Sequence, residues 1–168
     1  MSNLRKTAKH VFQYLDDSSV RYWLEGKSLL GAIRIGDILP WDYDVEIGFN
    51  RDDLKLCIWL LRAGDKSIVD DKGFLWERAM EGNFFRVYFS KINRIHVKLF
   101  PFYSRNGTMT KDSWFINRNV EFSDRFLHPM SSIDFIGRHV PSPNNIRDFL
   151  DLKFGKQVFE NVQQHSND

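Results

Sequence analysis

The sequence predicts a single α/β domain (α+β) in which helices flank a set of strands. Its 168 residues suit one domain with a sizeable core, and hydrophobic residues make up 42% of the chain. Two kinds of pattern carry this prediction. Residues 4–17 place apolar side chains at helical spacing, whereas residues 20–24, 38–49 and 93–102 show the apolar or alternating patterns of strands.

The other elements are predicted from similar patterns and from their boundary residues. Asn50 or Asp52 is expected to cap a helix, Gly155 to end another, and Asn106-Gly107 to form a hairpin turn. Residues 103–145 are expected to hold short strands and turns, and the polar tail at 163–168 to be mobile. In chain order we expect a helix at 4–17, a strand at 20–24, a helix at 28–34, a strand at 38–49, a helix at about 52–62, strands at 67–70, 84–89 and 93–102, and a helix at 146–154.

Three acids alternate along the predicted strand at 38–49. Alternate residues of a strand share one face, so these carboxylates form a row, called here the acid row: Asp42, Asp44 and Glu46. The residues between them, Tyr43, Val45 and Ile47, are then expected to face the core. Crowded carboxylates repel unless a cation compensates them, and hard oxygen ligands suit Mg²⁺ or Mn²⁺. The alternative is that the acids form the solvated face of an antiparallel sheet.

A glycine-rich segment, Gly26–Gly31, lies shortly before the acid row. It is expected to floor a cleft into which the acids project, as a loop that enters a helix and offers its N–H groups to phosphate. Gly26, Lys27 and Ser28 are the candidate phosphate contacts, and Arg34 follows about two helical turns later. The alternatives are a helix cap for Ser28, a surface lysine for Lys27 and a surface ion pair for Arg34.

Composition limits the classes of function. The formal net charge is +2, which is too weak to indicate nucleic acid as a partner. Cys57 is the only cysteine, so no intrachain disulfide and no multi-cysteine zinc site can form, and its apolar neighbours favour a buried structural thiol. No run approaches the length of a membrane span, and the first residues lack an apolar signal core.

A longer pattern surrounds these motifs and covers nearly the whole chain in order. Its segments are Tyr22–Arg34, Gly36–Glu46, Gly73–Glu77, Glu81–Val87, His96–Tyr103, Arg105–Asp112, Pro143–Asn145 and Leu152–Gly155. On these segments the chain resembles the LicD/fukutin family. The resemblance implies a polymerase-β-like nucleotidyltransferase fold with a mixed sheet flanked by helices.

The resemblance also implies an activity and its partners. It implies metal-dependent transfer of a phospho-alditol, such as a ribitol 5-phosphate, or of a related phospho-group, from a CDP-activated donor to a glycan on a glycoprotein. Asp42, Asp44 and Glu46 would be catalytic and hold Mg²⁺ or Mn²⁺. A homo-oligomer or a sister transferase is a further partner that the resemblance allows. It implies the Golgi lumen as the location, while a cytoplasmic protein or a fragment stays open.

Three residues depart from the family pattern. Glu46 and Lys98 stand where the family carries Asp, and Lys27 stands where Gly is usual. Lys98 is a candidate substrate-binding residue. It is expected to face Asp44 or Glu46 across neighbouring strands and to form an ion pair that replaces part of the metal's charge, and its alternative is a solvated strand residue. The alternative function is therefore a catalytically impaired member that binds nucleotide or a partner enzyme without turnover.

Three further residues have weaker signals. Arg86 is expected to pair with the acids or with donor phosphate, and its alternative is a solvated strand position. His96 lies beside Lys98 on the same strand face, and a lone histidine is more often structural than catalytic. Lys153 is interpreted as a helix C-terminal charge.

Overall fold

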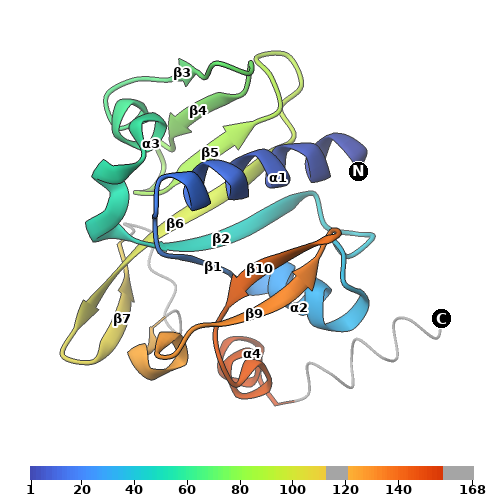
Figure 1. Cartoon of the computed structure of the whole chain (residues 1–168), viewed down its shortest axis with the longest axis vertical. Helices are drawn as coiled ribbons and strands as arrows, with labels where there is room; N and C mark the ends of the chain where they lie inside the picture. The colour runs from blue at the N-terminus through green and yellow to red at the C-terminus, as the bar shows by residue number, and fades with distance from the viewer. Residues whose placement is uncertain (113–120, 157–168) are drawn as a thin grey trace.

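A mixed sheet forms the centre of the computed structural model, which describes residues 1–112 and 121–156. Within these residues, the sheet order is β1 (Tyr22–Leu24), β2 (Asp44–Asn50), β6 (His96–Arg105), β5 (Phe85–Tyr88), β4 (Leu75–Arg78) and β3 (Ile68–Val69) (Figure 1). β7 (Thr108–Lys111) pairs with β6, and β8 (Phe122–Ser123) pairs with β7. The pair β2–β6 is parallel and the other pairs are antiparallel, so the predicted mixed sheet is confirmed.

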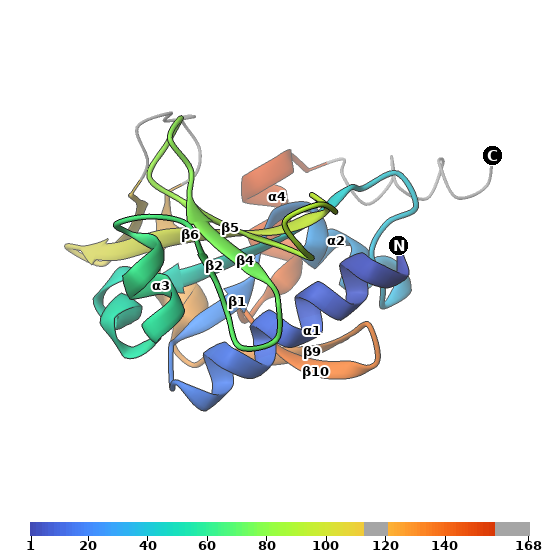
Figure 2. The ribbon, with the colours of Figure 1, turned by 90° about the horizontal axis from the view of Figure 1, so that it is seen from above.

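Helices lie on both faces of this sheet. Figure 2 shows α1 (Ser2–Asp17) on one side and α4 (Ile146–Phe154) on the other. The α4 helix contacts α2 (Gly26–Ile35), and α2 contacts β2. A hairpin of β9 (Ser131–Phe135) and β10 (Arg138–Ser142) packs beside β1. The described chain also holds α3 (Ile58–Ala63) and two short 3₁₀ helices, η1 (Arg51–Leu56) and η2 (Asp124–Leu127).

The first helix covers the apolar face of the central strands. Its apolar residues recur at helical spacing and are all buried, as the sequence predicts: Leu4, Ala8, Val11, Phe12 and Leu15. They pack over buried side chains of β2 and β6, among them Val45, Ile47, Val97 and Leu99. Because strand side chains alternate between faces, Glu46 and Lys98 point to the opposite side of the sheet.

Several predicted boundaries are confirmed. Gly155 ends α4 with φ +92°, a conformation that glycine adopts readily. Asn106 and Gly107 both have positive φ between β6 and β7, as a two-residue hairpin turn requires. The Asn50 side chain accepts a hydrogen bond from the Asp52 N–H at 3.0 Å, so Asn50 is the cap. Cys57 is buried and forms no disulfide.

Other details differ from the prediction. The helix expected at about 52–62 is divided into η1 and α3, because Cys57 between them has extended backbone angles. The strand β4 was not predicted, since its short Leu75–Arg78 sequence has no clear alternation. The tail at 163–168 lies outside the described residues. In the described part of the chain, no helix is both long and apolar enough to cross a membrane.

Trp23 of β1 packs closely on Gly48 of β2 and helps to position Glu25, the residue before α2. Trp23 lies opposite Gly48, and a Cβ atom on Gly48 would come within 2.5 Å of the indole ring. The ring therefore occupies the space that a side chain at residue 48 would need. Its Nε1 donates a hydrogen bond to Glu25 Oε2 at 2.9 Å, so Gly48 also permits the contact that fixes Glu25.

We expect Gly48→Ala to lower the free energy of unfolding by about 2 kcal/mol, because the added methyl group overlaps the Trp23 ring. Urea unfolding measures the loss. Trp23→Phe removes the overlapping atoms, so the double variant should lose less stability than the sum of the single variants. Strict additivity would show that the methyl group does not meet the indole.

Candidate functional site

The acid row lies where β2 begins, on the face of the sheet opposite α1. Asp44 and Glu46 belong to β2, whereas Asp42 lies in the turn before it, with its N–H bonded to the Leu39 carbonyl at 3.0 Å. The prediction that one strand carries all three acids is therefore wrong for Asp42. The expectation that Tyr43 faces the core is also wrong: Tyr43 is 85% exposed, because the strand begins only at Asp44.

Lys98 faces the acids, as the sequence predicts. The parallel register pairs Glu46 with Lys98 and Asp44 with His96. The Lys98 ammonium lies 3.0 Å from Asp44 Oδ2, and both side chains remain partly exposed. One of the carboxylates of the acid row is thus compensated by a protein cation.

Glu46 is the most enclosed acid of the row. Its carboxylate lies over Gly26, where an added Cβ atom would come within 2.7 Å of Oε2, and Gly26 has φ +52°. Burial, together with the charges of Asp44 and Glu25, raises the pKa of Glu46 to about 7. Its backbone N–H donates to Ser28 Oγ at 2.8 Å. Ser28 therefore fastens α2 to β2 and does not cap the helix.

Glu25 is a site residue that the sequence analysis missed. Its carboxylate accepts the Gly26 N–H at 3.1 Å and the Trp23 Nε1–H at 2.9 Å, and it pairs with Lys153 at 3.2 Å. The Glu25 carboxylate thus occupies the N-terminus of α2, the position at which the sequence predicts a phosphate. The local signal was available, since an acid directly before Gly26 is suited to cap the helix.

Two more lysines reach the same face. The Lys153 ammonium lies against the rings of Phe102, Phe122 and Phe149, so it is a buried partner of Glu25 and not merely a helix C-terminal charge. The Lys111 ammonium lies 3.9 Å from the centre of the Phe100 ring. Burial lowers the pKa of Lys111, and the charges of Glu25 and Glu46 offset only part of that shift. The local sequence could not reveal this, because Lys111 and Lys153 arrive from distant elements.

The remaining candidate residues differ in their relation to the acid row: Lys27, Arg86 and Arg34. Lys27 is exposed. Its positive charge offsets part of the rise in the pKa values of Asp42 and Glu46 that burial causes. Arg86 pairs with Glu77 at 3.6 Å and with Glu81, not with the acid row. Arg34 lies in the last turn of α2, about 12 Å along the helix axis from Gly26. We therefore leave Arg34 out of the proposed site.

The acid row is better suited to a metal ion that a substrate also binds than to an ion enclosed by protein ligands alone. No group of three His, Cys, Asp or Glu side chains in the described ranges is arranged to hold a metal ion. Burial and the neighbouring Asp44 charge raise the pKa of Asp42, so these two carboxylates are electrostatically coupled. Mg²⁺ typically takes one or two carboxylates and completes its shell with water and substrate phosphate. Asp42 and Asp44 are the two candidate carboxylates for such an ion.

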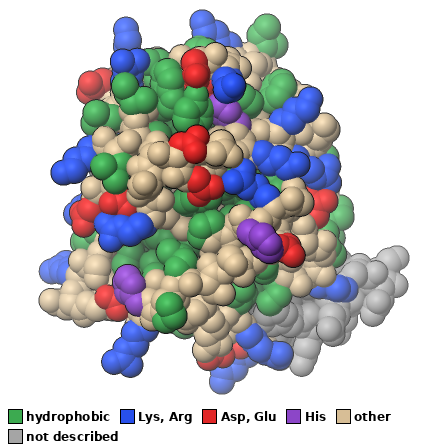
Figure 3. Space-filling model, viewed as in Figure 1, with side chains coloured by type: hydrophobic (Ala, Val, Ile, Leu, Met, Phe, Trp, Pro, Cys, Tyr) green, Lys and Arg blue, Asp and Glu red, His purple; other side chains and the backbone are tan. Residues whose placement is uncertain are grey.

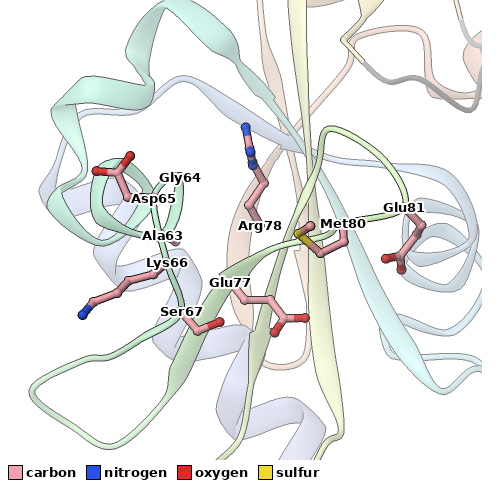
Figure 4. A pocket seen from close by; sticks show the side chains of 9 residues that line it. All are labelled: Ala63, Gly64, Asp65, Lys66, Ser67, Glu77, Arg78, Met80 and Glu81. Carbon is pink, nitrogen blue, oxygen red and sulfur yellow. The ribbon is translucent and has the colours of Figure 1, made fainter.

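Two hollows lie near these elements. One has a volume of about 360 Å³ and is lined in part by Asp42, Tyr43 and His96. The other, of about 190 Å³, lies between the end of α3 and β4, and Figure 4 shows its lining side chains, including Glu77 and Glu81. Of the acid row, Asp42 alone lines the first hollow, and no residue of the row lines the second. On the face drawn in Figure 3, basic and acidic side chains are interspersed.

The raised pKa of Glu46 predicts a pH-dependent stability. Between its ordinary pKa of 4.5 and about 7, the unfolded chain ionises while the folded carboxyl stays protonated, so this group's contribution to stability falls as the pH rises. Glu46→Gln should therefore be more stable than the wild type at pH 8, by up to about 3 kcal/mol, and similar to it at pH 4. Urea unfolding at both pH values measures this. The exposed Glu121→Gln is the control, and an equal effect at both pH values would contradict the assignment.

Comparison with known proteins identifies the family of this chain. Residues 19–145 match the protein family described as "LicD/FKTN/FKRP, nucleotidyltransferase domain". The chain is 53% identical over 161 residues to the human protein named "Ribitol 5-phosphate transferase FKRP", and 54% identical over 161 residues to the mouse protein of the same name. These matches cover 95% of this chain but 32% and 33% of the relatives. The chain therefore spans about a third of their length.

A bacterial relative shares only a part of the chain. An uncharacterized protein of Rickettsia prowazekii (strain Madrid E) is 35% identical over 51 residues, which are 30% of this chain and 19% of that protein. The family match at residues 19–145, by contrast, contains the acid row, Gly26 and Lys98. The match covers most of the chain, and the structure has the mixed sheet that the fold requires. The chain belongs to the LicD/FKTN/FKRP family of nucleotidyltransferase domains.

Proposed function

We propose that this domain transfers ribitol 5-phosphate, or a closely related phospho-alditol, from a CDP-activated donor to a glycan on a glycoprotein, with Mg²⁺ or Mn²⁺ as the cofactor. The observation that carries the proposal is the identity over 95% of the chain to proteins named ribitol 5-phosphate transferase. The location proposed with it is the Golgi lumen. Asp42 and Asp44 of the acid row would hold the ion that such a transfer needs, and Lys98 beside Asp44 adds a protein cation.

The proposed reaction breaks a phosphoanhydride bond of the donor and forms a phosphodiester bond to the acceptor. An acceptor hydroxyl oxygen bonds to the phosphorus that carries the alditol. The bond from this phosphorus to the bridging oxygen breaks, and CMP leaves with the electron pair. The hydroxyl proton passes to solvent. Negative charge therefore grows on the leaving phosphate, and catalysis depends on cations placed beside it.

The residues of this chain divide the work. Asp42 and Asp44 would hold the divalent ion, which neutralises the diphosphate of the donor as a Lewis acid. Lys98 and Lys111 place positive charge on the same side of the sheet, near Glu46. Glu25 and Ser28 act indirectly, because they fix the start of α2 against β2.

One observation favours a second candidate function. The Lys98 ammonium lies 3.0 Å from Asp44 and so competes with an ion for the same oxygen. A family member that binds nucleotide or a partner enzyme, such as a sister transferase or a second copy of itself, without turnover would tolerate this competition. Turnover with a CDP-activated alditol distinguishes the two functions.

The first test is catalytic. With CDP-ribitol and a glycoprotein acceptor, the purified protein should release CMP only when Mg²⁺ or Mn²⁺ is present. Asp44→Asn should lower the rate roughly 100-fold and remove the Mn²⁺-induced rise in melting temperature. Asp134→Asn, whose carboxylate is 78% exposed and pairs with His139, is the control and should keep both. CDP binding without CMP release in the wild type would favour the second function.

The second test concerns Lys98. Lys98→Asp removes a positive charge and adds a negative one beside the ion, so we expect Mn²⁺ to bind at least tenfold more tightly. Lys98→Met separates the two effects, because it removes the charge without adding a ligand. Calorimetric titration with Mn²⁺ measures the dissociation constants. Equal or weaker binding by Lys98→Asp would show that Lys98 does not compete with the ion.

A further inference from the structure

The tip of the β6–β7 hairpin carries a motif that the proposed reaction does not use. Asn106, Gly107 and Thr108 have the order Asn-x-Thr with a middle residue other than proline, which is the acceptor motif for N-glycosylation. No other asparagine of the 168 residues is followed two positions later by Ser or Thr. The hairpin turn explains Asn106 and Gly107, but it places no requirement on Thr108, the residue that completes the motif.

The turn holds this motif in solvent. Asn106 has φ +52° and Gly107 has φ +81°, and Arg105 pairs with Thr108 on either side of them, so the two residues form the whole loop. Both are exposed, as are Ser104 and Arg105 before them. The hairpin projects from the body of the molecule at the end of β6 (Figure 1). A bulky glycan on Asn106 therefore does not have to displace any part of the core.

The side-chain amide of Asn106 is available for modification. It forms no hydrogen bond within residues 1–112 and 121–156, which the structure describes. The amide of Asn144, by contrast, donates to the carbonyl oxygens of Arg125 and Pro129 at 2.8 and 2.7 Å. A substituent on Nδ2 of Asn144 would disrupt these bonds, whereas one on Nδ2 of Asn106 breaks no contact that holds the fold together.

The motif lies far from the acid row. Arg105 follows Lys98 by seven positions in the same strand, which corresponds to roughly 23 Å at about 3.3 Å per residue. The acid row pairs with the start of β6, whereas the turn follows the end of β6. A glycan at the turn thus leaves the acids and Lys98 accessible.

We propose that Asn106 is an N-glycosylation site and carries an N-linked glycan in the mature protein. The inference goes beyond the transfer reaction. It rests on the proposed function for one point, the location, because a protein of the Golgi lumen passes through the compartment in which such glycans are attached.

The modification forms one bond and breaks one. The Asn106 Nδ2 atom bonds to the anomeric carbon of an oligosaccharide that a polyprenyl diphosphate carries. The bond from that carbon to the phosphate oxygen breaks, and the diphosphate leaves with the electron pair. One amide proton passes to solvent through the cell's oligosaccharide transferase, so Nδ2 keeps a single hydrogen.

Enzymatic removal of the glycan tests the inference. The protein purified from the cells that make it should lose mass on treatment with peptide-N-glycosidase, which converts the modified asparagine to aspartate. In H₂¹⁸O this reaction labels the new carboxylate, so mass spectrometry of the peptide with residue 106 separates it from any unlabelled aspartate. An unmodified Asn106 in this peptide would overturn the proposal.

Variants expressed in the same cells define the motif. Asn106→Asp removes the acceptor amide but suits the same turn, and Thr108→Val keeps a β-branched strand residue without the hydroxyl, so both should lose the glycan completely. Thr108→Ser retains the hydroxyl and should keep the glycan. Thr110→Val changes the same strand outside the motif and is the matched control, which should keep it too. A glycan retained in Thr108→Val, or lost in Thr110→Val, would contradict the assignment.

The outcomes separate this inference from the proposed function. Protein made in bacteria that lack this pathway carries no glycan, and its release of CMP tests the transferase whether or not Asn106 is modified in its own cells. A glycan at Asn106 without CMP release would support the inference and contradict the transferase. Release of CMP, with an unmodified Asn106 in the protein from its own cells, would do the reverse.

Discussion

Four carboxylates gather where β2 and α2 meet, and their mutual repulsion is the constraint that the surrounding structure has to satisfy. The protein relieves this repulsion in several ways. Asp44 pairs with Lys98, Glu25 pairs with Lys153 and accepts two N–H groups, and Glu46 has a pKa raised to about 7. Asp42 lies at the end of the row, beside the cavity. Because the protein itself neutralises part of this charge, the site can fold before any ion or substrate arrives.

The parallel pairing of β2 and β6 gives the site its two ends. It aligns Asp44 with His96 and Glu46 with Lys98, so the polar residues of two distant segments share one face. Toward Asp42, this face ends at the cavity that Asp42 and His96 help to line. Toward Glu46, it continues to lysines that β7 and α4 supply. The same face of the sheet thus has a cavity at one end and paired acids and lysines at the other.

Local sequence patterns predicted the elements better than the site. The amphipathic helix, the alternating acids and the Asn106-Gly107 turn all depend on neighbours along the chain, and each pattern was sufficient to predict its element. The turn that leaves Asp42 outside β2 and Tyr43 in solvent depends on where strand pairing begins, which the pattern does not encode. Glu25 and Lys153 form their pair only because α4 packs against the start of α2. Such long-range contacts cannot be derived from the spacing of residues in one sequence.

The position of Lys98 links these charges to the proposed reaction. Its ammonium stabilises Asp44 in the free protein, so an ion that takes Asp44 must first displace a bonded cation. A donor diphosphate changes this balance, because it brings new anionic oxygens to the same face. Lys98 could then pair with a donor phosphate, and Asp44 would be left to hold the ion. In the proposed mechanism, ion and donor therefore bind cooperatively, and a lysine in place of an acid weakens binding of the ion alone more than binding of the ion with its substrate.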